Sequence, residues 1–178
     1  PLLYWPITSG QRDLTDAAVS NVNDFMKNGG TILIDLREQT TGTTLFGQAT
    51  RGTQELRRLT EGLEIPQLTP VPPDHVLTKS FYLMQEFPGR FAGGTVWLDA
   101  GQEQINDGVT PVVIGSNDWA GAWAVNDYGR PLHAVVPGGE RQRELAYRFG
   151  VNLAMYAMTG NYKADQVHVP FILERLGQ

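Results

Sequence analysis

Residues 14–35 constrain the fold of this chain more than any other segment. Apolar residues recur at helical spacing over its first half, and Asp13 or Thr15 can cap the helix that this pattern predicts. Asn28-Gly29-Gly30 ends the helix, because glycine readily adopts the left-handed conformation found at helix ends. The strand Thr31–Asp35 (TILID) follows at once and is apolar and β-branched. A helix, a glycine stop and a buried strand form half of a parallel α/β unit.

The rest of the chain predicts strands and helices in alternation, separated by a proline-rich, extended excursion over residues 62–94. Alternating elements favour a mostly parallel sheet with helices on both faces, so we expect one three-layer α/β domain of 178 residues. The expected strands are residues 2–7 (buried), 95–98, 111–114 and 132–136, and the expected helices are residues 53–61, a short helix after residue 116, and residues 140–159.

Composition argues against several classes of function. The net charge of −5 argues against nucleic-acid binding, because phosphate binding needs a clustered basic face. The chain has no cysteine, which excludes disulfides, thiolate metal sites and a cysteine nucleophile. No apolar run reaches the roughly 18 residues needed to span a membrane. The chain begins directly with an expected strand, which suggests a piece of a longer protein.

In parallel α/β folds, ligands bind beyond the carboxyl ends of the strands. This rule selects the loops 35–37, 99–102 and 116–123 as one rim. Asp35 could act there as a general base or bind a ligand. The alternative is an acid at a strand end that caps the next turn. The candidate ligand rim consists of Asp35, Arg37, Asn117, Asp118 and Trp119.

Two further patterns near the rim have ordinary structural alternatives. Gly115-Ser116-Asn117-Asp118 superficially resembles a nucleophile elbow, but the elbow requires G-x-S-x-G, so a helix cap is the better interpretation. Trp119 and Trp123 are one helical turn apart and could stack on a ligand, although such pairs more often lie in the core.

The histidines give little support for a metal site or a catalytic triad. His75, His133 and His168 lie far apart in the sequence, and no pair has the short spacing that is common in metal sites. We therefore expect neither a metal nor another cofactor.

The start of the C-terminal helix is a candidate anion or partner site. A Pro-Gly-Gly turn precedes Arg141 and Arg143, and free backbone amides with guanidinium groups could hold a phosphate or carboxylate. The alternative is local ion pairing, because Glu144 is spaced to pair with Arg141 and Arg148.

The polar loop after this helix is a second candidate for partner contacts. Its residues Asn161, Tyr162, Lys163 and Asp165 either recognise a partner or tie a final helix to the body. That final helix begins near Pro170 and has an apolar face of Ile172, Leu173 and Leu176.

Several motifs carry a resemblance to a known family. RFGVN, TGNYKADQVHVP and LERLGQ, together with LLYWPI, NGGTILID and GSNDWAGAWA, resemble a bacterial domain-of-unknown-function family. Its members form the C-terminus of large membrane-anchored proteins with an aerotolerance-regulator (BatA-like) region. The resemblance implies a flavodoxin-like fold of the class I glutamine-amidotransferase type. DHVLTKSFY is also similar to a segment of the related trehalose-utilisation (ThuA-like) proteins, with Val76 in place of a proline.

One departure from those relatives bears on function. In amidotransferases a cysteine follows the strand that NGGTILID resembles, whereas this chain continues with Leu36 and Arg37 and has no cysteine. Thioester chemistry on glutamine is therefore excluded for this chain. Because the family's activity is uncharacterised, the resemblance assigns no catalytic residue.

These observations favour a non-catalytic ligand-binding or protein-interaction domain of an envelope-associated bacterial protein. The alternative is a hydrolase or sugar-modifying enzyme that uses Asp35. The resemblance implies a C-terminal piece of a membrane-anchored protein, with the periplasmic side favoured. The expected partners are other domains or subunits of a membrane-anchored complex, or a small-molecule ligand.

Overall fold

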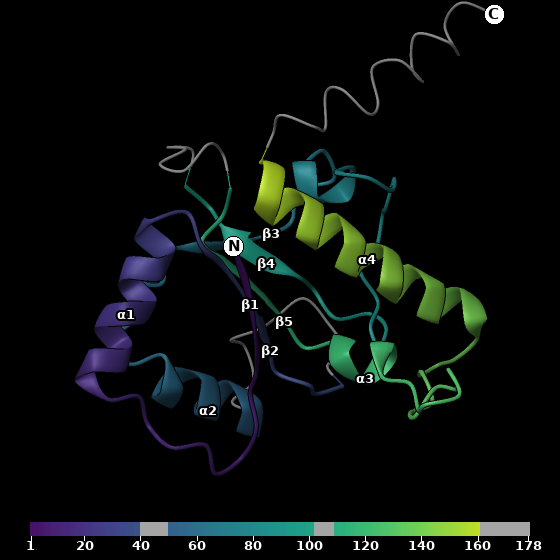
Figure 1. Cartoon of the computed structure of the whole chain (residues 1–178), viewed down its shortest axis with the longest axis horizontal. Coiled ribbons are helices and arrows are strands. Elements are labelled where there is room, and N and C mark those ends of the chain that lie inside the picture. Colours follow the sequence, from purple (N-terminus) through teal and green to yellow (C-terminus); the bar gives the residue numbers. More distant parts are fainter. Residues whose placement is uncertain (40–49, 102–108, 161–178) are drawn as a thin grey trace, which may run out of the picture.

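A computed structural model describes residues 1–39, 50–101 and 109–160 (Figure 1). One five-stranded sheet, in the order β1-β2-β5-β4-β3, forms the centre of the described part. Its strands are β1 (Leu2–Pro6), β2 (Thr31–Asp35), β3 (Leu68–Pro70), β4 (Trp97–Asp99) and β5 (Val112–Gly115), and the helices are α1 (Asp16–Lys27), α2 (Arg51–Leu59), the short 3₁₀ helix η1 (Val76–Thr78), α3 (Trp119–Trp123) and α4 (Glu140–Thr159).

The strand directions make the sheet mostly parallel. β1 pairs with β2 and β2 with β5, both in parallel. β4 runs antiparallel to β5, and β3 runs antiparallel to β4, so β4 alone among the five is reversed. The expected three-layer, flavodoxin-like α/β fold is confirmed.

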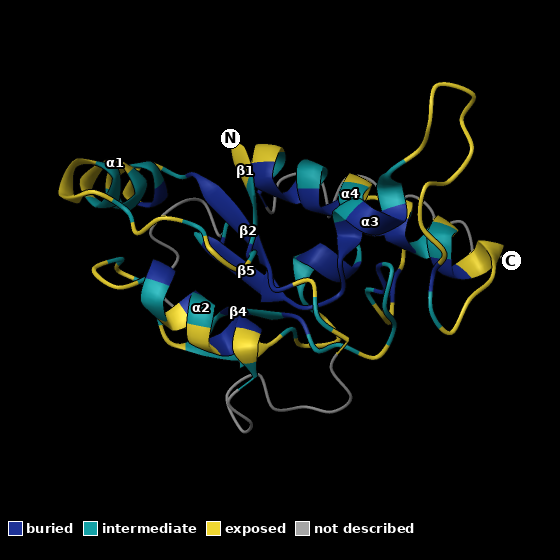
Figure 2. Ribbon diagram, turned by 90° about the horizontal axis from the view of Figure 1, so that it is seen from below, coloured by how far each residue is buried: buried dark blue, intermediate teal, exposed yellow. Residues whose placement is uncertain are grey.

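Side chains alternate between the two faces of the central strands and build two cores. Ile32 and Ile34 of β2 pack in the core formed with α1 and α2. Leu33, between them, packs in the opposite core with Trp119 of α3 and Phe149 of α4. Figure 2 shows buried β2 and β5 between the two helical layers.

Local capping explains where the first two helices begin. The Thr15 hydroxyl accepts a hydrogen bond from the amide of Ala18 at 3.2 Å, so Thr15 rather than Asp13 caps α1. Thr50 accepts in the same way from the amide of Thr53 at 3.2 Å, and α2 therefore begins two residues earlier than expected. The sequence-based bounds of α4 are confirmed without change.

The structure corrects three expectations about strands. β1 is an edge strand that pairs with β2 alone in the described part, so it is not buried, and the exposed fraction of Leu2 is 37%. The excursion contains the short strand β3, which the sequence analysis missed. Residues 132–136 form no strand: Val136 makes one isolated bridge to Phe91, and the following proline has no N–H to continue a ladder.

Within the described ranges, every helix is too short or too polar to cross a membrane.

Candidate functional site

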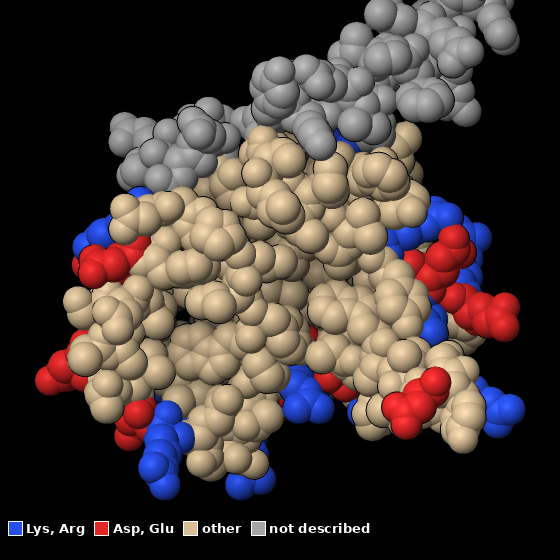
Figure 3. All heavy atoms as spheres, viewed as in Figure 1, with Lys and Arg blue, Asp and Glu red and all other residues tan. Residues whose placement is uncertain are grey.

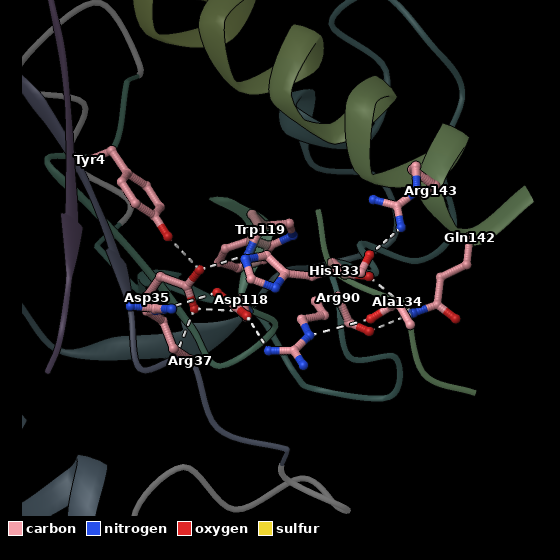
Figure 4. A network of polar contacts seen from close by, with 11 residues as sticks. Tyr4, Asp35, Arg37, Arg90, Asp118, Trp119, His133, Ala134, Gln142 and Arg143 are labelled. Carbon is pink, nitrogen blue, oxygen red and sulfur yellow. Dashed lines mark hydrogen bonds and ion pairs between the residues drawn. The ribbon is translucent and has the colours of Figure 1, made fainter. Parts of the chain in front are cut away.

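Asp35, at the carboxyl end of β2, lies at the centre of the rim and is completely buried. One carboxylate oxygen accepts the backbone N–H groups of Arg37 and Asp118 at 3.0 and 3.1 Å. The other accepts the backbone N–H of Trp119 at 2.8 Å and the Tyr4 hydroxyl at 2.9 Å. Both oxygens therefore have two protein donors each, in a shell that joins β1, β2 and the start of α3 (Figure 4).

Burial and hydrogen bonding act on Asp35 in opposite directions. Burial raises the pKa of its carboxyl group, while the surrounding donors favour the charged form and counter part of this rise. Burial and the adjacent Asp35 also raise the pKa of the Tyr4 phenol, so Tyr4 stays protonated and donates. In this geometry Asp35 accepts hydrogen bonds from four protein groups and thereby stabilises the fold.

Asp118 forms a second buried carboxylate beside the first. Its oxygens contact Arg37 Nε at 3.0 Å and Arg90 Nη1 at 3.4 Å. Asp118 stands at the N-cap position of α3 but makes no side-chain cap hydrogen bond. The helix therefore begins after the predicted capping segment, but the Asp118 side chain does not cap it. Its carboxylate forms ion pairs with Arg37 and Arg90 instead.

The backbone at both ends of the Arg37–Asp118 ion pair is unusual. Arg37 has φ of 56° and Asp118 has φ of 51°, in the left-handed region that non-glycine residues rarely occupy. The amides of these same residues donate to Asp35. Such a conformation costs about 1 kcal/mol or more, and here the shared hydrogen bonds and the ion pair hold it in place.

A chain of polar contacts leads from this rim to the start of α4 (Figure 4). Arg90 Nε donates to the carbonyl of Ala134 at 3.3 Å, so one guanidinium group connects Asp118 to residues 132–136. Gln142 Nε2 donates to the carbonyls of Gly89, Arg90 and Val136. Arg143 donates to the carbonyls of Ala122 and His133.

This polar chain braces the base of a hairpin formed by residues 124–132, here called the 124–132 hairpin. The backbone N–H of Leu132 donates to Ala124 O at 3.0 Å, and the N–H of Asn126 donates to Arg130 O at 2.9 Å. Asn126 Oδ1 also accepts the N–H groups of Tyr128 and Arg130 at 3.0 and 2.9 Å. Hydrogen bonds thus fix both the base and the tip, while the hairpin itself is largely exposed (Figure 2).

The structure brings the five predicted rim residues together, with only Arg37 exposed to solvent. Asn117 and Trp119 are buried, and both of their side chains donate to the carbonyl of Phe87. Trp119 also stacks on Phe149 at 4.6 Å between ring centres, which confirms its expected place in the core. The arrangement favours the structural interpretation of these side chains.

Residues 99–101, the described part of the 99–102 loop, do not belong to this rim, and Gln102 lies outside the described residues. β4 is reversed, so its carboxyl end, at Asp99, lies at the amino end of β5, where Asp99 N–H contacts Thr110 Oγ1 at 3.1 Å. The expectation assumed that β4 runs parallel to its neighbours. Its direction removes the Asp99 loop from the carboxyl-end site.

The other candidate residues have separate environments. Arg143 donates to backbone carbonyls rather than facing an anion, and Arg141 is exposed near the start of α4. The expected Glu144–Arg148 ion pair is present at 2.5 Å. The candidates that lie outside the described residues are Asn161, Tyr162, Lys163, Asp165 and His168.

The described histidines do not join Asp35. His75 packs edge-on against Tyr156 at 5.4 Å, beside the amino end of β5, and burial lowers the pKa of its imidazole. His133 is exposed in the segment after the hairpin. Within residues 1–39, 50–101 and 109–160, no three His, Asp or Glu side chains form a cluster suited to a metal ion.

Sequence analysis missed three residues that build the site: Tyr4, Arg90 and Gln142. Tyr4 occupies an alternating position of β1, on the same face as Leu33, which is a signal that could have indicated its direction. Arg90 lies in an aperiodic stretch and Gln142 in the first turn of a helix, so neither has a local pattern that indicates its partners.

Fold and site together define a three-layer, flavodoxin-like α/β domain whose strand-end carboxylate is an internal hydrogen-bond acceptor. The chain belongs to the family described as domain of unknown function (DUF4159), whose model matches residues 1–158. The expected membership of a domain-of-unknown-function family is thereby confirmed. A comparison with curated proteins found no match.

Proposed function

We propose that this chain is a non-catalytic protein-interaction domain that presents the 124–132 hairpin to a partner protein. The observation that carries the proposal is the exposure of large apolar side chains on a braced hairpin. The exposed fractions of Tyr128, Leu132 and Val125 are 88%, 57% and 44%. Tyrosine side chains act as anchors in protein interfaces, and neighbouring aliphatic side chains add apolar area that is buried on binding.

The bracing of the hairpin supports a binding role energetically. A partner that binds a flexible loop must order its backbone, which costs about 1–2 kcal/mol for each residue that becomes fixed. Hydrogen bonds from Asn126 at the tip, and from Arg143 and Arg90 near the base, already fix the backbone. Asp127 and Arg130 add one charge of each sign beside Tyr128, as expected for the polar rim of an interface.

The surroundings of Asp35 favour binding over the alternative of a hydrolase or sugar-modifying enzyme. A general base must reach the proton that it abstracts. Asp35 is fully buried, and its oxygens accept from Arg37, Asp118, Trp119 and Tyr4. To reach the Asp35 carboxylate, a substrate would have to displace one of these four hydrogen-bond donors, which also stabilise the fold.

The resemblance of the sequence supports a more specific setting. Its motifs are similar to those at the C-terminus of membrane-anchored, BatA-like bacterial proteins with an amidotransferase-like fold. We therefore propose that the partner is another domain or subunit of a membrane-anchored envelope complex, on the periplasmic side. A partner protein with an apolar pocket for a tyrosine would match the hairpin.

Binding of the purified chain to the membrane-anchored remainder of its parent protein tests the proposal. Tyr128→Ala should weaken binding at least about tenfold without a change in thermal stability, because truncating a central aromatic anchor costs about 2 kcal/mol or more and about 1.4 kcal/mol is tenfold in affinity. Leu83→Ala is the matched control, because Leu83 is also well exposed, at 71%, but lies outside the hairpin. Equal affinity of the two variants would contradict the proposal.

Catalysis is tested separately with a panel of hydrolase and glycosidase substrates. The proposed role predicts no turnover above that of a heat-denatured sample. Turnover that disappears in a folded Asp35→Asn variant would overturn the non-catalytic assignment and establish the enzyme alternative.

A further inference from the structure

Two arginine side chains meet at the carboxyl-end rim on the buried carboxylate of Asp118. Arg37, which follows β2, contacts one Asp118 oxygen through Nε at 3.0 Å. Arg90, from the segment before β4, contacts the other oxygen through Nη1 at 3.4 Å. Figure 4 shows the two arginines on either side of Asp118. Because one buried group holds both guanidinium groups, their positions are fixed before any ligand arrives.

These contacts leave part of each guanidinium group unused. Among the residues that the structure describes, neither terminal nitrogen of Arg37 has a hydrogen-bond acceptor, and Nη2 of Arg90 has none either. The side chains of Arg37 and Arg90 are 40% and 34% exposed, so these donors can reach a ligand in solvent. Figure 3 shows basic side chains at the surface of this edge, between α2 and α3. The rim therefore presents cationic donors from two segments of the chain.

The arginines outnumber the carboxylates with which they pair. Both share the single carboxylate of Asp118, whose side chain is only 2% exposed, so one positive charge has no ion-pair partner there. Asp35 is completely buried and accepts from backbone amides and the Tyr4 hydroxyl, not from an arginine side chain. Glu38 faces the start of α2, where its Oε1 accepts the backbone N–H of Gly52 at 2.7 Å. An anion from solution would supply the missing negative charge.

We infer that Arg37 and Arg90 bind the oxyanion of a small molecule, a carboxylate or phosphate group. A planar guanidinium group can donate two parallel hydrogen bonds to either kind of group. The site stands beyond the carboxyl ends of β2 and β5, where parallel α/β domains bind ligands. The left-handed backbone of Arg37, with φ of 56°, agrees with this role, because such conformations cluster at ligand-binding sites. The inference does not rest on the 124–132 hairpin.

Titration of the full chain with acetate and, separately, with inorganic phosphate tests the inference. Sodium chloride holds the ionic strength constant, so that general screening of charge is not counted as binding. Nuclear magnetic resonance follows the side-chain Nε–H signals of Arg37 and Arg90. Both signals should shift in a saturable way with at least one of the two anions. The anion that saturates the site at the lower concentration identifies the bound group as a carboxylate or a phosphate.

Arg37→Lys tests whether the guanidinium geometry matters, because lysine keeps the positive charge beside Asp118 but lacks the planar pair of donors. It should raise the half-saturating concentration at least about tenfold, since the loss of one charge-assisted hydrogen bond weakens binding by that much. Arg141→Lys is the matched control, because Arg141 is exposed at the start of α4, outside the rim. It should leave the titration unchanged. Circular dichroism checks that each variant is folded.

Two results would overturn the inference. One is the absence of a saturable shift with both anions in the natural chain, which requires no variant. The other is equal half-saturation of Arg37→Lys and Arg141→Lys, which would assign the response to basic charge in general. A failure of the hairpin to bind a partner protein would leave these titrations unchanged, so the two proposals can fail separately.

Discussion

At the residue scale, Asp35 carries the clearest prediction. In Asp35→Asn, the new amide group can let the Tyr4 hydroxyl reverse and accept, but the facing backbone N–H of Trp119 then loses its acceptor. Loss of charge-assisted bonds and one unsatisfied buried N–H should lower the free energy of unfolding by about 2–4 kcal/mol. Urea denaturation followed by circular dichroism measures this value.

Tyr4→Phe is the matched control for that measurement. It removes a single donor to Asp35 and leaves the three backbone N–H donors in place. A loss of about 1–2 kcal/mol is expected. Equal stability of Asp35→Asn and the natural chain would show that the carboxylate does not support the fold.

The sequence indicated Asp35 but not what surrounds it. Asp35 follows an unmistakable buried strand, so its position at a strand end was predictable. Its partners Tyr4 and Trp119 lie 31 and 84 residues away along the chain. No local spacing encodes such contacts, because they exist only once β1 and β5 flank β2.

His75 predicts a pH dependence of stability. Its Nδ1 accepts the N–H of Leu77 at 3.1 Å, which requires the neutral ring, and burial lowers its pKa below the ordinary 6.5. The unfolded chain therefore binds a proton more readily than the folded chain. The stability contribution is present above pH 6.5 and is lost as the pH falls through the folded pKa.

His75→Asn isolates this effect, because asparagine can still accept from Leu77 but does not titrate. Between about pH 7.5 and pH 5, the free energy of unfolding should fall less in His75→Asn than in the natural chain. Urea titrations at the two pH values measure both. Parallel losses would contradict a role for this imidazole. Asp74 and Lys79 act on the same pKa in opposite directions and are present in both proteins.

At the element scale, Asn152 joins α4 to the segment around η1. Its amide oxygen accepts the N–H groups of Phe81 and Tyr82, and its amide nitrogen donates to the carbonyls of Leu77 and Tyr82. Asn152 is fully buried, so Asn152→Leu would leave several backbone groups without partners. A loss of about 3–5 kcal/mol is expected from urea denaturation, with faster amide exchange at Phe81 and Tyr82.

Val151→Leu provides the control on the neighbouring residue of the same helix. Val151 is exposed, so this substitution should change the free energy of unfolding by less than about 0.5 kcal/mol. If Asn152→Leu were equally neutral, the segment around η1 would not depend on α4 for its position.

Length decided which elements the sequence could predict. α4 has 20 residues with a regular apolar face, and its predicted bounds match those observed. β3 has three residues and ends at a proline, which is too short for an alternation to be recognised. The pattern at residues 132–136 was strand-like, yet within the described part this segment makes only an isolated bridge, and Pro137 follows.

At the scale of the whole molecule, the two cores should unfold together. β2 and β5 contribute side chains to both cores, so neither helical layer can detach without exposing the other face of the same strands. Trp5 and Trp97 pack in the core on the α1–α2 side, so a double variant in which both are replaced by phenylalanine keeps tryptophan only on the other side. The fluorescence of this variant reports on Trp119 and Trp123, which pack on the α3–α4 side. Its thermal midpoint should coincide with that from far-ultraviolet circular dichroism. Separate midpoints would show that the layers unfold independently.

The class of fold was predictable, and the direction of one strand was not. Alternating helices and strands indicated a mostly parallel sheet, as found. Hydrophobic patterning of residues 95–98 indicates a strand but does not specify its direction, which depends on the long connection from β3 to β4. The reversal of β4 is why Asp99 was wrongly placed at the rim.

The 124–132 hairpin also has a use in protein engineering. Val125 and Pro131 form a bridge between the two arms of the hairpin. Just after the hairpin, Arg143 and Arg90 donate hydrogen bonds to the backbone carbonyls of residues 133 and 134. Contacts to carbonyls do not depend on which side chains the held segment carries. The tip at residues 127–128 is therefore a natural place to graft a foreign peptide, displayed on a cysteine-free carrier that already holds both ends of the insert together.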